Sequence, residues 1–208
     1  MTDFIFDIDG TIWNTTGIVA AAWMEAVKDS GVEELKDLVI TDKVLQKEFG
    51  KPMNVIADDL FGDIDPRVKA DLLALCCKYE HEAIEKNEEN ITYDKVVETI
   101  KELAKENNLY ICSNCQEGYI ELVIAKNHLE DYIKDFECYG HTLLSKGQNI
   151  KLLAERNHMT NPVYVGDTMG DYEATVEAGV PFIHCTYGFG EVEKPYKAIA
   201  SFDQLLNI

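Results

Sequence analysis

Two carboxylates near the N-terminus are the residues of this chain best suited to do chemistry. Asp7 and Asp9 are separated by one residue and directly follow the apolar run Phe4-Ile5-Phe6. Such a run, bounded by polar residues, is typical of a buried strand in a parallel sheet, and residues two apart at its end project to the same side. Two acids placed in this way repel each other unless a cation or a proton separates them. Carboxylate oxygens are hard ligands, so the pair predicts a Mg²⁺ site.

Further polar groups follow later apolar runs. Ser113 and Asn114 come after one run, where a hydroxyl and neighbouring N–H groups suit phosphate oxygens. Lys146 opens a predicted helix, and the unfavourable helix dipole there makes sense if the lysine faces an anion. Asp167 and Asp171 follow another run. Because open α/β sheets bind ligands at the carboxyl ends of their strands, we expect all these groups to meet at one sheet edge.

The elements that must position these residues follow from the hydrophobic pattern. Short apolar runs predict five strands, at residues 4–6, 109–112, 136–139, 163–165 and 182–185. Helical spacing predicts helices at residues 17–30, 35–49, 54–61, 67–86, 94–107, 117–127, 146–157 and 170–178, with a last one starting near residue 201. Strands that alternate with helices indicate a doubly wound, Rossmann-like parallel sheet of the α/β class.

The helices are not evenly distributed between the strands. No strand signal occurs between Trp13 and Asn90, so the first strand is followed by a block of helices. We therefore expect residues 1–14 and 90–208 to form the α/β core and residues 15–89 to form an inserted, all-helical cap domain.

Composition narrows the possible partners and location. The 208 residues include 38 acidic and 19 basic ones, and the net charge of −19 opposes binding to nucleic acid or to an anionic membrane surface. No apolar stretch has the length of a membrane-spanning helix, and no signal peptide is visible. The six cysteines are interpreted as small hydrophobic residues of a reducing compartment. A cytoplasmic location is expected, whereas the oligomeric state is open.

The motifs together resemble those of the haloacid dehalogenase-like (HAD) hydrolase superfamily. The signature Asp-x-Asp-Gly-Thr, Ser113, Lys146 and Gly-Asp-x-x-x-Asp occur in the order of that family, and the resemblance covers essentially the whole chain. It is closest to the branch with a helical cap after the first strand, which includes the phosphoglycolate phosphatases. This resemblance implies a Mg²⁺-dependent phosphatase that hydrolyses a small phosphorylated metabolite, a phosphate monoester, through an aspartyl-phosphate.

The resemblance also implies residue roles. Asp7 would be the nucleophile and Asp9 the general acid and then the general base. Ser113 and Lys146 would hold the transferring phosphoryl oxygens. The metal ligands would be Asp7, the main-chain carbonyl of Asp9, and Asp167, with support from Asp171.

Substrate contacts are less well defined by the sequence. Thr11 and Asn114, next to the catalytic motifs, are expected to contact substrate. Lys51, in a turn of the helical block, would meet a carboxylate or second anionic group of the substrate, although an exposed lysine at a helix end is an equally good interpretation. Trp13, beside the expected hinge, is interpreted mainly as a packing residue.

Other functions on the same motifs stay open. Sugar phosphomutases of this branch carry a histidine where this chain has Val19, which weighs against a mutase. Dehalogenases of the superfamily lack the second aspartate of the signature, so Asp9 weighs against dehalogenation. A phosphonate hydrolase would need a cap lysine for a Schiff base, for which Lys51 is the nearest candidate. A phospho-accepting signalling module uses a similar set of acids, hydroxyl and lysine, but a durable phospho-aspartate gains nothing from an adjacent acid or base.

Overall fold

The computed structural model describes all 208 residues, and their contacts divide the chain into two compact units. The first unit comprises Met1–Asn14 and Ile91–Ile208, and the second comprises Thr15–Asn90. The two boundaries expected from the sequence lie after residues 14 and 89.

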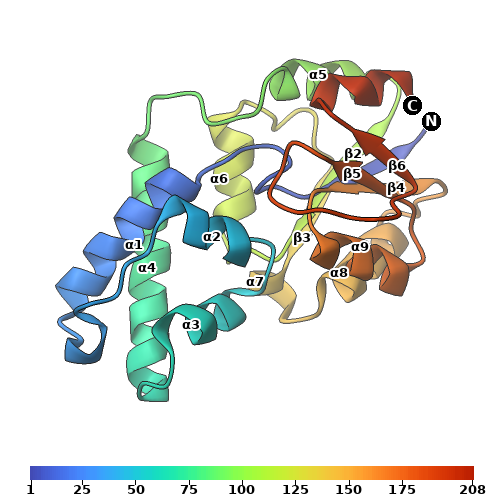
Figure 1. Cartoon of the computed structure of the whole chain (residues 1–208). Helices are drawn as coiled ribbons and strands as arrows, with labels where there is room; N and C mark the ends of the chain where they lie inside the picture. Colours follow the sequence, from blue (N-terminus) through green and yellow to red (C-terminus); the bar gives the residue numbers. More distant parts are fainter. The chain divides into compact units, whose positions relative to one another are not determined.

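A six-stranded parallel sheet forms the centre of the first unit (Figure 1). Its strands are β1 (Asp3–Phe6), β2 (Asn108–Ser113), β3 (Asp135–Cys138), β4 (Pro162–Gly166), β5 (Phe182–Cys185) and β6 (Lys197–Ile199). Their order is β3-β2-β1-β4-β5-β6, and Phe6 is in register with Ile111 of β2 and Val165 of β4. The order reverses at β1, as in a doubly wound sheet, so the fold class predicted from the sequence is confirmed.

Helices cover both faces of the sheet in this unit. They are α5 (Val96–Leu103), α6 (Tyr119–Lys126), α7 (Tyr139–Thr142), α8 (Lys146–Arg156), α9 (Met169–Ala178) and the 3₁₀ helix η2 (Phe202–Asn207). Figure 1 shows α5 and η2 on one face and α8 and α9 on the other. Side chains of β1 alternate between these faces. Ile5 joins the core that includes Ile150 and Leu153 of α8, whereas the ring of Phe6 lies 5.4 Å from that of Phe202 in η2.

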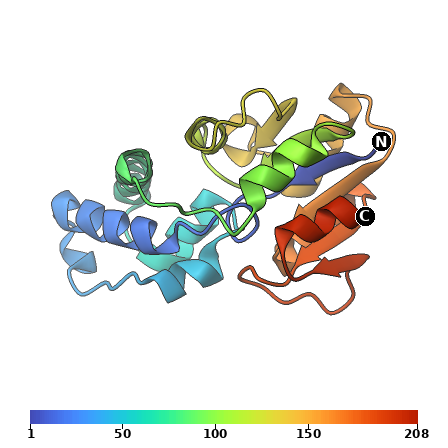
Figure 2. The ribbon, with the colours of Figure 1, turned by 90° about the horizontal axis from the view of Figure 1, so that it is seen from above.

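The C-terminal helix η2 packs against helix α5 of the same unit. Helices α5 and η2 pack side by side, as Figures 1 and 2 both show. An ion pair of 2.8 Å between Lys95 and Asp203 joins the start of α5 to η2. The C-terminal residues therefore close one face of the sheet.

The second unit contains only helices. They are α1 (Thr16–Ser30), the 3₁₀ turn η1 (Glu33–Leu35), α2 (Asp42–Glu48), α3 (Met53–Phe61) and α4 (Pro66–Lys86). Helix α1 packs along α4, and the indole N–H of the buried Trp23 donates a 2.8 Å hydrogen bond to the buried Glu80 of α4. Gly31 ends α1 in the left-handed conformation that favours glycine, and Asp65 caps the start of α4.

Three elements differ most from those expected from the sequence. The helix predicted over residues 35–49 is wrong in its first half, because η1 ends at Leu35 and α2 begins only at Asp42. The β-branched residues 39–41 disfavour a helix, and Thr41 caps α2 by accepting a hydrogen bond from the Val44 N–H. Strand β6 and helix α7 were not predicted, since three or four residues are too few to show a hydrophobic period.

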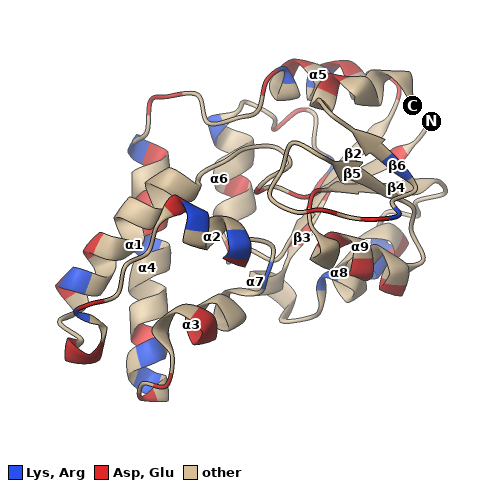
Figure 3. Ribbon diagram, viewed as in Figure 1, with Lys and Arg blue, Asp and Glu red and all other residues tan.

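Acidic residues occur on the helices of both units (Figure 3), in keeping with the net charge of −19. All six cysteines are free thiols. None of the helices combines the length and apolar character needed to cross a membrane.

Candidate active site

Three adjacent strands deliver polar side chains to the carboxyl edge of the sheet. Asp7 directly follows β1, Ser113 is the last residue of β2, and Asp167 directly follows β4. The main-chain N–H of Asp7 donates to the Val165 carbonyl at 2.9 Å, which continues the pairing of β1 with β4 beyond the strand. All three side chains are buried. The order β2-β1-β4 therefore brings together residues that lie more than 50 positions apart in the chain.

Lys146 joins two of the acids in this cluster. Its ammonium group lies 2.9 Å from Asp7 Oδ1 and 2.5 Å from Asp171 Oδ1. It is the first residue of α8, whose start is held by a capping box between Ser145 and Gln148. Lys146 is 5% exposed and is the one buried lysine or arginine of the chain. A buried cation between two buried carboxylates offsets charge that the fold would otherwise not tolerate.

Burial and neighbouring charges set the protonation of Asp7 and Lys146. Burial raises the pKa of Asp7 to about 6, with a further increase from Asp171, while Lys146 and a hydrogen bond from Ser113 act in the opposite direction. Burial alone would lower the pKa of Lys146, but the charges of Asp171 and Asp7 outweigh it and raise that pKa. At neutral pH the lysine is therefore charged and Asp7 is mostly ionised.

Asp171 organises the loop that follows β4. Its Oδ2 accepts hydrogen bonds from the Asp167 N–H (3.2 Å), the Thr168 N–H (3.0 Å) and the Thr168 hydroxyl (2.8 Å). Burial opposes ionisation, but Lys146 and these donors hold the pKa of Asp171 below its usual value. Since its other oxygen receives the lysine, Asp171 acts as an anchor for the lysine and for the main chain at Asp167.

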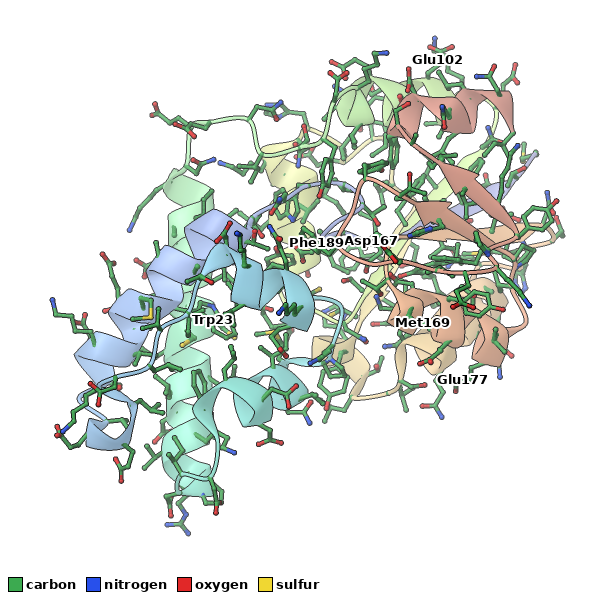
Figure 4. The ribbon with its side chains drawn as sticks, in the orientation of Figure 1. Trp23, Glu102, Asp167, Met169, Glu177 and Phe189 are labelled. Atoms are coloured by element: carbon green, nitrogen blue, oxygen red, sulfur yellow. The ribbon has the colours of Figure 1, made fainter.

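Asp167 has the highest pKa of the three clustered acids Asp7, Asp167 and Asp171. Its Oδ2 accepts a 2.6 Å hydrogen bond from the Phe189 N–H, and the two residues lie beside each other in Figure 4. Burial, together with the negative charges of Asp171 and Asp7, raises its pKa to about 8. Asp7, Asp167 and Asp171 each offer an oxygen within 4.8 Å of the others. Three buried acids around one lysine carry excess negative charge, and this donor set fits a hard cation.

The loop that carries Phe189 closes tightly over Asp167. A Cβ added to Gly188 would lie 2.3 Å from the Cβ of Asp167 and 2.5 Å from the Gly10 carbonyl oxygen. The buried His184 ring contacts the main-chain carbonyls of Asp167 and Gly190 at 3.1 and 3.2 Å. It therefore links the main chain at Asp167 to the loop that packs over it. The absence of a side chain at Gly188 is therefore a condition for the position of Asp167.

Replacing this glycine tests the packing. We expect Gly188→Ala to displace the loop from Asp167, to lower stability by about 1–3 kcal/mol, and to weaken metal binding, because main-chain atoms cannot yield to the new methyl group. Gly170→Ala in α9 is the matched control, since its added Cβ meets only the Thr168 hydroxyl, at 3.6 Å. Thermal unfolding of both variants checks this. Equal melting temperatures would contradict the close-packing argument.

Asp9 is held by two neutral donors on one oxygen. The Trp13 indole N–H lies 3.0 Å and the Tyr119 hydroxyl 2.9 Å from Asp9 Oδ1. The expectation that Trp13 mainly packs is therefore incomplete, and Tyr119 was not expected at the site at all. Tyr119 begins α6 and shows no motif in the sequence. The position of the Gly118-Tyr119 pair, five residues after the end of β2, is the only signal that it starts a helix near the strand ends.

The other residues predicted to contact substrate have varied surroundings. The Thr11 hydroxyl is buried and points to Asp167 Oδ1 at 3.4 Å, and Asn114 is half-buried directly after β2. Lys51 belongs to the helical unit, where its ammonium group pairs with Glu48 at 2.7 Å and Asp59 at 2.8 Å. Its role toward substrate stays a prediction.

Comparison with known proteins gives consistent results. The model of a family described as haloacid dehalogenase-like hydrolase matches residues 4–185. A solved structure of a predicted phosphoglycolate phosphatase from Haemophilus somnus has a TM-score of 0.83 at 18% identity, and covers 100% of this chain and 97% of its own. A putative haloacid dehalogenase-like hydrolase from Bacteroides fragilis has a TM-score of 0.82 at 20% identity, with 98% and 99% covered.

A third similar structure contains a ligand. It is CbbY from Rhodobacter sphaeroides in complex with xylulose-(1,5)bisphosphate, with a TM-score of 0.81 at 16% identity and coverage of 99% of this chain and 96% of its own. No curated protein matches this chain. At these identities, the likeness to the solved structures shows the fold.

Proposed function

This chain belongs to the haloacid dehalogenase-like hydrolase family, and from that premise we propose that it is a Mg²⁺-dependent phosphatase. Its substrate would be a small phosphate monoester, hydrolysed through an aspartyl-phosphate on Asp7. The observation that carries this proposal is the buried contact of Lys146 with Asp7, beside Ser113 and within the cluster of acids. The predicted phosphoglycolate phosphatase among the similar structures supports a phosphate ester as substrate.

The first chemical step transfers the phosphoryl group to the protein. A carboxylate oxygen of Asp7 attacks phosphorus, and the bond between phosphorus and the leaving oxygen breaks. The leaving oxygen takes a proton from the carboxyl group of Asp9 and departs as an alcohol. Lys146 and Ser113 stabilise the negative charge on the phosphoryl oxygens. A pKa of about 6 makes Asp7 ionised at neutral pH, while its burial leaves it poorly solvated and therefore reactive.

The second step returns the protein to its starting state. The carboxylate of Asp9 takes a proton from a water molecule, and the water oxygen attacks phosphorus. The bond between phosphorus and Asp7 breaks, which releases phosphate and leaves Asp9 protonated for the next cycle. One residue thus serves both steps, so its position relative to Asp7 controls both rates.

The metal would be held by Asp7, Asp167 and the main-chain carbonyl of Asp9, with Asp171 in support. When bound, Mg²⁺ supplies positive charge for the phosphoryl oxygens and for the crowded carboxylates. The raised pKa of Asp167 supports this assignment, because it arises from burial and from the charges of Asp171 and Asp7, and a bound cation would offset both.

The alternative activities receive less support. A Schiff base requires a neutral amine, but hydrogen bonds to Asp59 and Glu48 raise the pKa of Lys51, which argues against a phosphonate hydrolase. A signalling module has no use for an acid held as firmly as Asp9. We further propose that the helical unit is the cap that covers the substrate, that Lys51 contacts it, and that the protein is cytoplasmic.

Release of phosphate from a panel of phosphorylated metabolites tests the proposal directly. We expect turnover of at least one small phosphate monoester in the presence of Mg²⁺. Excess EDTA should lower the rate by at least about 100-fold, because the developing charge would then face three acids with one lysine, and added Mg²⁺ should restore it. Undiminished turnover in EDTA would reject the metal assignment, and no phosphate release from any ester would reject the phosphatase.

A further inference from the structure

Two aromatic side chains donate hydrogen bonds to the same oxygen of the Asp9 carboxyl group. Trp13 Nε1–H and the Tyr119 hydroxyl both donate to Oδ1, at 3.0 and 2.9 Å. Asp9 itself is only half-buried and lies in a turn between β1 and the helical unit. A short acid in such a place would ordinarily change rotamer easily. Two hydrogen bonds on one oxygen remove most of that freedom.

Both donors are themselves rigid. Trp13 is fully buried. Its main-chain N–H donates to the Ile8 carbonyl at 3.2 Å, and its main-chain carbonyl accepts from the Gly10 N–H at 2.9 Å. Tyr119 is 1% exposed in the first turn of α6. The two rings meet edge to face, with centroids 5.7 Å apart. The donors therefore hold Asp9 as one packed unit rather than as two mobile side chains.

The kind of donor differs between the two aspartates. Asp7, which must stay ionised to attack phosphorus, receives a charged ammonium from Lys146. Asp9 must gain and lose a proton in each cycle, and Trp13 and Tyr119 are neutral. A cation would bind the carboxylate form strongly, whereas neutral donors fix its orientation and still permit protonation.

We propose that Trp13 and Tyr119 are positioning residues that orient Asp9 for proton transfer to the leaving group. This inference rests on the proposed phosphatase function and assigns it two residues outside the motifs. The two side chains do not touch the phosphoryl group in this scheme. They act through Asp9, so their removal should matter in proportion to how much the leaving group needs a proton.

Two substrates of nearly the same shape separate this role from a general structural one. Phenyl phosphate releases a poor leaving group that needs the proton, whereas p-nitrophenyl phosphate releases a phenolate that departs with little assistance. The quantity to compare is kcat/KM, because it reports the steps up to formation of the aspartyl-phosphate. We expect Trp13→Phe with Tyr119→Phe to lower kcat/KM at least about 30-fold for phenyl phosphate and less than about 3-fold for p-nitrophenyl phosphate.

The Asp9→Asn background provides the decisive comparison. If Tyr119 acts through Asp9, Tyr119→Phe should change the ratio of the two kcat/KM values in the wild-type protein and leave it unchanged when Asp9 is already asparagine. Tyr119→Phe removes only the hydroxyl, so this arm does not depend on the more drastic loss of the indole. An equal effect in both backgrounds would overturn the inference.

Two control variants remove the same kinds of hydrogen bond elsewhere. Trp23→Phe deletes an indole bond to the carboxylate of Glu80, and Tyr187→Phe deletes a 2.9 Å hydroxyl bond to the Thr11 carbonyl. Neither variant should alter the ratio of the kcat/KM values for the two substrates. A parallel loss on both substrates, or no loss, in the Trp13 and Tyr119 variants would overturn the positioning role while the wild-type protein still hydrolyses phosphate esters. If the wild type hydrolyses neither ester, the phosphatase proposal fails and this inference fails with it.

Discussion

Asp7→Asn should abolish phosphate release while the fold is retained. An amide is a very poor nucleophile toward phosphorus, so we expect kcat to fall at least about 1,000-fold, which corresponds to about 4 kcal/mol in activation free energy. The amide has nearly the same shape as the carboxyl group and still offers an oxygen to Lys146, 2.9 Å from the acid in the wild type. The loss should therefore be chemical rather than structural. A kcat within tenfold of wild type would show that Asp7 is not the nucleophile.

The same substitution should stabilise the metal-free protein. Burial raises the pKa of Asp7 from 3.8 to about 6, so the folded state resists its ionisation more than the unfolded state does. Stability is then lost as the pH rises through the interval between these values, and at pH 7 the cost is on the order of 3 kcal/mol. The asparagine carries no such cost. We expect its melting temperature in EDTA to exceed that of the wild type at pH 7 and to approach it near pH 4.

Lys146→Met should cause the largest loss of stability of any single substitution at the site. The lysine pairs with both Asp7 and Asp171, which are buried within hydrogen-bonding distance of it, and offsets part of their negative charge. Removal of one partner from a buried ion pair typically costs about 3–5 kcal/mol, because the remaining charges stay desolvated. Activity should also disappear, since the transferred phosphoryl group loses the side chain proposed to bind it.

Two comparisons make this prediction specific. Lys151→Met changes an exposed lysine on the same helix and should shift stability by less than about 0.5 kcal/mol. Lys146→Met combined with Asp171→Asn should recover part of the stability but none of the activity, because it removes one uncompensated charge and restores no cation. Chemical denaturation of the three proteins gives the free energies of unfolding. If Lys146→Met were as stable as Lys151→Met, the electrostatic account of the cluster would be wrong.

Local sequence was sufficient to predict most of the sheet and the residues at its edge. The run Phe4-Ile5-Phe6 and the polar residues after it identify a buried strand and its carboxyl end, and the same pattern marks Asp167 after β4. Helices with long apolar periods, such as α4, were predicted to within one residue of their start. Strand β6 was not predicted, because its three residues are too few to show a hydrophobic period.

For the candidate site, the sequence indicates which residues take part but not the protonation state of each acid. Asp7, Asp9, Ser113, Lys146, Asp167 and Asp171 stand in motifs whose residue types and order indicate phosphate and metal chemistry. Their motif cannot give the protonation of each acid, because a pKa depends on burial and on charges from other segments. The difference between Asp171, whose pKa is lowered, and Asp167, whose pKa is raised to about 8, arises from where Lys146 and the Thr168 donors lie.

The sequence alone therefore determined the class of fold and the chemical character of the sheet edge, since strand periodicity and short motifs are properties of neighbouring residues. Only the tertiary structure decided how each acid is held. It placed Lys146 between Asp7 and Asp171, set Gly188 against Asp167, and brought Tyr119 to Asp9 across 110 residues. Such contacts depend on the packing of separate strands and helices against one core, and no local pattern of residues records which distant side chain will arrive there.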